Sequence, residues 1–111
     1  MAALTVTAVP IAGGISLSDN LVAAAAGGDT APTGPGRVLA VKNADASSHT
    51  VTLATPGTVN GLTVQDATVT VPAGKVSLIP LARVFAGASG RAALTYDAVT
   101  SLSVGVFELG T

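Results

Sequence analysis

The sequence predicts an all-β protein: a single antiparallel β-sandwich, jelly-roll or immunoglobulin-like, of roughly seven to eight short strands with one short Ala-rich helix near residues 18–26. First, apolar residues alternate with threonine along much of the chain, as in Thr-Val-Thr-Leu at residues 50–53. Second, Gly, Pro, Asn and Asp separate the short apolar runs, as turns do in such folds. Third, 111 residues suffice for one modest core and contain no linker. Residues 1–111 are therefore expected to form a single domain.

The first element is expected over residues 3–9, where apolar residues alternate with threonine. Residues 1–14 can form either a strand of the main sheet or an arm that adds a strand to a neighbouring subunit. Pro10 and Gly13-Gly14 would let such an arm swing away. The clean alternation favours the strand within the main sheet.

Residues 15–36 break the alternation and predict a short helix followed by a Gly/Pro-rich loop. Ser16 or Ser18 can cap the helix, whose Ala-rich body would end at Gly27-Gly28. At about eight residues this helix would be unstable alone, so it is expected to pack on the sheet. The following residues, 28–36, are the best loop candidate in the chain.

The remainder of the chain predicts strands joined by short turns. The expected strands cover residues 37–43, 49–54, 62–65, 67–71, 76–80, 91–96 and 99–109. Asn60-Gly61 is the strongest hairpin signal, because a type I′ turn needs positive φ at both central positions. Pro72-Ala73-Gly74 and Ala88-Ser89-Gly90 are further expected turns, and residues 44–48 form a polar connection. Residues 104–109 are apolar on both faces, so the last strand should lie centrally or beneath a partner.

Charged residues are scarce. They make up 10% of the chain, five basic and six acidic, where about 25% is usual. This balance provides neither the basic stripe that nucleic acid requires nor a polybasic membrane patch. We therefore expect no nucleic-acid partner and no membrane association, and the absence of cysteine excludes disulfides and thiol catalysis. At about one charge per 500 Å² of surface, the neutral surface is best explained as contact surface.

The single histidine, His49, lies near Asp45, Ser47 and Ser48. A hydrolytic triad converges from separate segments of the chain, whereas these four residues share one expected loop. We therefore expect His49 to be an exposed residue at the entrance of a strand. One histidine with scattered carboxylates also matches no metal-binding motif.

The acidic residues are Asp19, Asp29, Asp45, Asp66, Asp97 and Glu108. Five of these six lie in or next to an expected turn or helix start, where a carboxylate bonds nearby backbone amides. The glycines at 34–36 lack the rest of a phosphate-binding motif. The sequence thus predicts no catalytic, cofactor-binding or metal-ligating residue, no cofactor and no enzymatic activity.

Three aromatic residues remain as candidates for binding. Phe107 lies in the most apolar strand and is expected in the core, which leaves Phe85 and Tyr96 as the only rings that could face outward. Phe85 either plugs the end of the sandwich or anchors a partner. Together with the N-terminal segment, its surroundings form the candidate protein interface, comprising Leu4, Val6, Val9, Ile11, Arg83, Val84 and Phe85.

Residues 37–81 and 90–109 resemble small Ala/Gly/Thr/Val-rich β-sandwich proteins encoded among the virion structural genes of tailed phages, especially those of actinobacterial hosts. The most recognisable pieces are VKN at residues 41–43, TVTVPAG at residues 68–74 and the closing valine-rich strand. The resemblance covers about residues 3–109.

Proteins of this kind are head decoration or minor capsid proteins, which bind the outside of a shell of major capsid protein and often cluster as trimers. The resemblance implies a structural protein on the capsid exterior, made in the host cytoplasm, whose partners are the major capsid protein and copies of itself. Two alternatives stay open. One is a head–tail connector or tail component, and the other, of a different class, is a carbohydrate-binding β-sandwich module.

Overall fold

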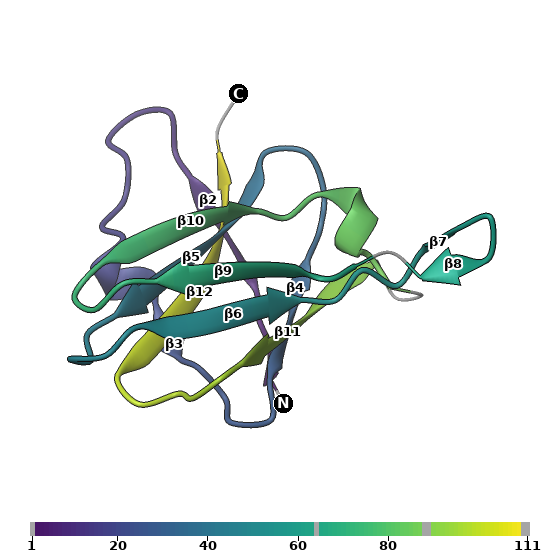
Figure 1. Ribbon diagram of the computed structural model, residues 1–111. Coiled ribbons are helices and arrows are strands. Elements are labelled where there is room, and N and C mark those ends of the chain that lie inside the picture. Colours follow the sequence, from purple (N-terminus) through teal and green to yellow (C-terminus); the bar gives the residue numbers. More distant parts are fainter. Residues whose placement is uncertain (1, 64, 88–89, 110–111) are drawn as a thin grey trace.

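Two β-sheets pack face to face in the computed structural model of the chain, which describes residues 2–63, 65–87 and 90–109 (Figure 1). The predicted all-β sandwich is confirmed. Within the described residues there are twelve strands, more than predicted because several are only two residues long. None of the helices in this part of the chain has the length and apolar character needed to cross a bilayer.

Each sheet draws strands from distant parts of the sequence. Sheet A has the order β1 (Ala2–Ala3), β4 (Asp29–Pro32), β11 (Arg91–Tyr96), β6 (His49–Leu53) and β9 (Ala67–Val71). Sheet B has the order β10 (Val76–Pro80), β5 (Arg37–Asn43), β12 (Leu102–Leu109) and β2 (Val6–Val9), with β3 (Val22–Ala23) also paired to β12. The remaining elements are the hairpin β7 (Thr58–Val59) and β8 (Leu62–Thr63) and the 3₁₀ helices η1 (Ser18–Asn20) and η2 (Arg83–Phe85).

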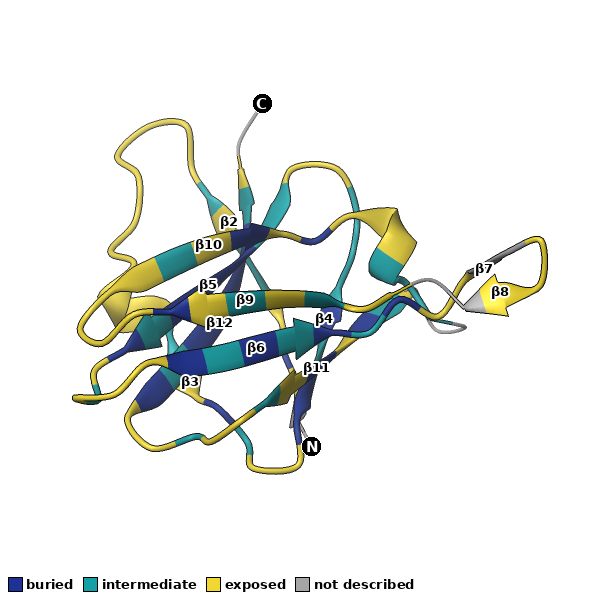
Figure 2. Ribbon diagram, in the orientation of Figure 1, coloured by how far each residue is buried: buried dark blue, intermediate teal, exposed yellow. Residues whose placement is uncertain are grey.

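The core lies between the sheets and is built by alternation. Along β6, buried Val51 and Leu53 alternate with the partly exposed Thr50 and Thr52 (Figure 2). Both sheets contribute fully or almost fully buried side chains, among them Ala31, Leu39, Val41, Leu53, Val71, Ile79, Leu94, Val104 and Val106. Each buried leucine or valine contributes about 1.5–3 kcal/mol to folding, so threonine on the outer positions and aliphatic residues inside fix the register.

Most predicted strands and turns are confirmed. The ranges 37–43, 67–71, 76–80 and 91–96 coincide with β5, β9, β10 and β11. Asn60 and Gly61 have φ values of 53° and 81°, as a type I′ turn requires. The turn at 72–74 is closed by the Lys75 N–H, which donates to the Pro72 carbonyl at 3.1 Å. Ala88 and Ser89 of the third predicted turn lie outside the described residues.

The N-terminal segment forms strands of this chain in both sheets. β1 pairs parallel with β4 in sheet A, and β2 pairs parallel with β12 in sheet B. Between them, the Leu4 N–H donates to the Thr30 carbonyl at 2.8 Å and the Leu4 side chain is buried. Within this single chain the segment therefore pairs as strands, and its pairing is parallel where antiparallel pairing was predicted.

The predicted helix near residues 18–26 is wrong. Only η1 is helical, and β3 follows it, with the Ala24 N–H donating to the Leu102 carbonyl at 3.0 Å. A helix this short gains too few internal hydrogen bonds to offset its nucleation cost, whereas extended backbone finds partners on β12. The predicted loop at 28–36 is also wrong in part, because Asp29–Pro32 forms β4 between β1 and β11.

β12 lies centrally in sheet B and is buried on both faces, as predicted for the last strand. Val104 and Val106 face the core, while Gly105 and Phe107 lie on the opposite face and are buried as well. Phe107 is thus buried as predicted, but on the outer face of the sheet. The outer face of β12 is covered by the connection between β2 and β3, and the candidate site lies there.

Candidate functional site

An apolar groove opens on the outer face of sheet B, with a volume of about 200 Å³. Its walls come from β2, β5, β10 and β12 and from the connection between β2 and β3. The lining residues, all apolar, are Val9, Ile15, Leu17, Val38, Leu78, Phe107 and Leu109. We call this feature the sheet B groove.

Strand register brings the groove residues together. Val38 lies opposite Phe107 on one side and opposite Pro80 on the other. Two positions further along β5, Ala40 lies opposite Gly105. A Cβ at Gly105 would lie 2.9 Å from Leu21 Cδ2, so the absence of a side chain there lets the β2–β3 connection close over the sheet.

The rim of the groove is exposed to solvent. Leu78 is 63% exposed and Leu109 is 52% exposed, while Ile15 and Leu17 are exposed to a smaller extent. Because fully burying a leucine contributes about 1.5–3 kcal/mol, a partner that covers this rim gains binding free energy from it. The lining contains no group that donates or accepts a proton, so the groove is suited to binding and not to acid–base chemistry.

A second neutral surface is formed where three connections gather at one end of the sandwich. They are residues 10–14 after β2, residues 33–36 before β5, and η2 after β10, and all three adjoin the same end of sheet B, in which β2 and β10 are the opposite edges. We call it the loop end. Ile11 is 81% exposed and Val84 is 55% exposed. In the sequence of these three segments Arg83 is the only charged residue.

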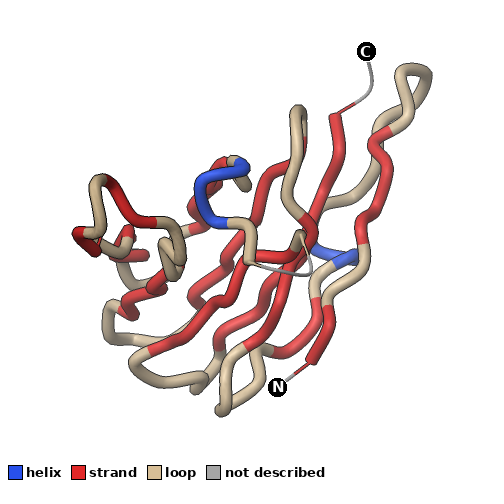
Figure 3. Tube along the Cα trace, turned by 90° about the vertical axis from the view of Figure 1, so that its right-hand side faces the viewer, coloured by secondary structure: helices blue, strands red, loops and turns tan. Residues whose placement is uncertain are grey.

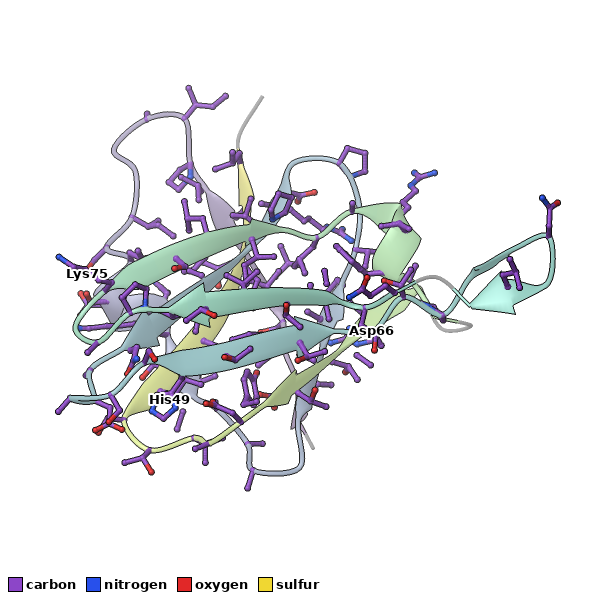
Figure 4. The ribbon with its side chains drawn as sticks, in the orientation of Figure 1. His49, Asp66 and Lys75 are labelled. Carbon is purple, nitrogen blue, oxygen red and sulfur yellow. The ribbon has the colours of Figure 1, made fainter. Side chains whose placement is uncertain are left out.

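At another end of the sandwich His49 lies buried between two carboxylates (Figure 4). Its Nε2 is 3.0 Å from Asp45 Oδ2 and its Nδ1 is 3.2 Å from Asp97 Oδ1. A carboxylate can only accept, so both ring nitrogens donate and the imidazole carries a positive charge in this arrangement. Burial, the largest single influence, lowers the pKa of His49, but hydrogen bonds and the charges of both aspartates together raise it above 6.5.

His49 begins β6 as predicted, but the expectation that it is exposed is wrong. With both nitrogens directed at carboxylates, the ring has no nitrogen available to activate Ser47 or Ser48. Asp97 Oδ1 also accepts the backbone N–H groups of Thr50 and Ala98, which, with His49, hold the pKa of Asp97 below its ordinary value. Among the described residues no cluster of three or more His, Asp or Glu can hold a metal ion.

Four of the six acidic residues accept hydrogen bonds of two kinds. Asp45, Asp66 and Asp97 each accept a backbone N–H near a turn, as predicted. Asp29 instead lies fully buried in β4, where its Oδ2 accepts the Tyr96 hydroxyl at 2.7 Å and the Ala25 N–H at 3.2 Å. The expectation that Asp29 belongs to a loop is therefore wrong.

The structure thus presents two largely apolar surfaces, the sheet B groove and the loop end, on a two-sheet sandwich. No protein-family model, curated protein or solved structure matches this chain. The function is therefore inferred from the residues and from the geometry of the surfaces.

The seven predicted interface residues do not form one patch. Leu4 is buried, and Val6 and Phe85 are partly buried against the core. Val9 lines the sheet B groove, and Ile11, Arg83 and Val84 are exposed at the loop end.

Sequence reasoning missed six groove residues, namely Ile15, Leu17, Val38, Leu78, Phe107 and Leu109. One signal was present in the sequence. The strand at 104–109 is apolar on both faces, which predicted a covering partner without identifying it. The segment that covers this strand, the connection between β2 and β3, could not be identified from sequence because a helix was expected near residues 18–26.

Proposed function

We propose that this chain is a non-enzymatic structural protein of a virion, a capsid decoration or minor capsid protein that binds and stabilises the outside of a shell of major capsid protein. The observation that carries the proposal is the loop end, where three connections whose sequence holds a single charged residue present the exposed Ile11 and Val84 at one end of sheet B. A surface with so little charge loses little hydration free energy when a flat protein lattice covers it.

The scaffold supports the same proposal. The loop end is mounted on a rigid two-sheet sandwich, and its side chains are mostly small, so binding immobilises few rotamers. Each copy that prefers the assembled shell stabilises the shell by linkage. The resemblance of residues 37–81 and 90–109 to virion β-sandwich proteins points to the same partner and to a location on the capsid exterior after synthesis in the host cytoplasm.

Shells that lack this protein provide the test. We expect the purified chain to bind them, and we expect Ile11→Asp and Val84→Asp each to weaken binding by at least about tenfold, because each buries a charge in an apolar contact. Thr68→Asp, on an exposed position of the sheet A edge strand β9, should bind like the unmodified chain. Failure of the unmodified chain to bind such shells would contradict the proposal.

The head–tail connector or tail component remains the alternative within this class. The two roles differ in copy number, since decoration places on the order of hundreds of copies on a shell and a connector ring places about a dozen at one vertex. Quantitative mass spectrometry of purified particles distinguishes them.

The carbohydrate-binding alternative has less support. Its two candidate rings are engaged, because the Tyr96 hydroxyl binds the buried Asp29 and Phe85 packs against the core. Binding on a glycan array that Tyr96→Ala abolishes would favour this alternative.

A further inference from the structure

The hairpin β7–β8 projects from the sandwich without packing on it (Figure 1, right). It pairs Thr58 with Thr63 and Val59 with Leu62, and Leu62 is 73% exposed. A Cβ built at Gly57 or Gly61 would have no neighbour within 4 Å. A two-stranded hairpin alone is at best marginally stable in water, so this one is a candidate for contact with another molecule.

The base of the hairpin fixes its direction. Asp66 Oδ1 accepts the N–H of Thr55 at 2.9 Å, which ties together the two chain segments that enter and leave the hairpin (Figure 4). Thr55 is buried, so this tie is anchored in the body of the protein. The sequence from residue 54 to residue 65 contains no charged residue, which is unusual for a segment that extends into water.

The sheet B groove has the matching character. Its seven lining residues are all apolar, and the exposed Leu78 forms part of its rim. Neither surface would need to strip water from a charge on contact, so the cost of desolvation is small for both. The exposed Leu62 on the projecting hairpin and the open apolar groove therefore match in polarity.

The hairpin cannot reach the groove of its own chain. The hairpin and the elements that form the groove lie on opposite sides of the molecule in both views (Figures 1 and 3), and the molecule extends 45 Å along its longest axis. We therefore infer that the β7–β8 hairpin of one copy places Leu62 in the sheet B groove of a second copy. Such a head-to-tail contact closes into a ring or continues as a filament, according to the rotation between copies.

The proposed shell binding uses the loop end, which shares the connection between β2 and β3 with the sheet B groove, so the two contacts are separated by variants of Val84 on η2 and Leu78 on β10, which belong to one surface each. The test measures the mass of the purified chain by light scattering and sedimentation over a range of concentrations. We expect the unmodified chain to self-associate and both Leu62→Asp and Leu78→Asp to weaken self-association by at least about tenfold. Both side chains are largely exposed, and unchanged circular dichroism verifies that each variant folds.

Mixing the two variants identifies the head-to-tail arrangement. Leu62→Asp keeps an intact groove and Leu78→Asp keeps an intact hairpin, so their mixture should form a heterodimer and nothing larger. Because the chain contains no cysteine, mixed Leu62→Cys and Leu78→Cys proteins should also form one defined disulfide under oxidation. Val84→Asp is the matched control, since it introduces the same charge at an exposed apolar site outside the groove and should preserve self-association.

Three outcomes would overturn the inference: a monomeric unmodified chain at every concentration, a mixture that stays monomeric, or self-association that survives Leu78→Asp. The same variants separate this inference from the proposed function. Val84→Asp should lose shell binding and retain self-association, whereas Leu78→Asp should lose self-association while its monomers still bind shells.

Discussion

His49 joins three parts of the chain that are distant in sequence or belong to different turns. The imidazole lies at the start of β6, Asp45 follows β5, and Asp97 follows β11. Since both contacts require a protonated ring, the charge of His49 is part of the folded structure at this end of the sandwich. On the neighbouring strand β9, the residue opposite His49 is Val71, which has no titratable group.

The stability of the protein should therefore depend on pH through His49. Its folded-state pKa is raised above 6.5, so its contribution is complete below pH 6.5 and is lost as pH rises through the folded-state pKa. The lowered pKa of Asp97 works in the opposite direction, because its contribution is present above 3.8 and is lost as pH falls through the lowered value. The cluster stabilises most between these limits.

Urea unfolding between about pH 5 and about pH 9 tests this. The midpoint should fall on the alkaline side for the unmodified chain, and this His49-dependent fall should be absent in His49→Gln. NMR gives an independent reading, because the chain has a single histidine and thus a single imidazole signal. An imidazole pKa at or below 6.5 would contradict the arrangement.

Tyr96 provides a second prediction at the scale of one residue. Its hydroxyl donates to Asp29, which is fully buried, and burial followed by the hydrogen bond and charge of Asp29 raises the pKa of Tyr96. Tyr96→Phe removes a donor from a buried carboxylate and should cost about 1.5–3 kcal/mol of unfolding free energy. Thr95→Val, on an exposed position of the same strand, should change it by less than about 0.5 kcal/mol. If Tyr96→Phe changed the unfolding free energy no more than Thr95→Val does, the hydrogen bond from Tyr96 to Asp29 would contribute nothing to stability.

At the scale of elements, local pattern was sufficient for some strands. Thr68 and Thr70 on β9 are exposed and its Val71 is buried, so period-two alternation located the strand from sequence. β3 and β4 depend instead on pairing partners far along the chain, on β12 and β11, and no local signal records those partners. Sequence alone thus predicted a short Ala-rich helix where pairing with β12 favours extended backbone.

The candidate site was less predictable than the fold. The sheet B groove combines Leu17, Val38 and Phe107 from three segments, and their proximity follows from sheet order. The loop end was partly predicted, because Ile11 and Val84 were identified as interface candidates from their apolar connections. Burial of His49 was missed because Asp97, one of its two partners, is 48 positions away in the sequence.

The turn before β4 depends on Gly28, which lies close to the backbone of β11. Its φ is 95°, and a Cβ there would collide with the carbonyl oxygen of Leu94 on β11. Gly28→Ala should cost more than about 3 kcal/mol, because the collision adds to the backbone strain of about 1–3 kcal/mol. Gly74 also has positive φ, 73°, but has open space around it, so Gly74→Ala should cost only about 1–2 kcal/mol. Thermal or urea unfolding measures both, and equal costs would show that the close approach to β11 can relax.

The whole molecule exposes more surface than its mass requires. Its accessible surface is 6014 Å², against roughly 5500 Å² for a compact monomer of 10.6 kDa. The projecting hairpin and the extended β2–β3 connection are visible sources of the excess (Figure 3). With five basic and six acidic residues to cover it, most of this surface is neutral. A neutral surface larger than that of a compact monomer of this mass favours a protein that works in contact with other chains.

This distribution of charge predicts how contacts between copies respond to salt. The proposed contact joins the exposed Leu62 to a groove lined by apolar residues, so it contains no ion pair to screen. Self-association should change by less than about twofold between about 0.05 M and 0.5 M sodium chloride. Sulfate should strengthen it, because excluded salts favour burial of apolar surface. Sedimentation at a fixed pH below 6.5, where His49 remains charged, measures both effects. Self-association that weakens steadily with sodium chloride would instead indicate a contact made by the few charged side chains, and would assign the interface to a surface other than the sheet B groove.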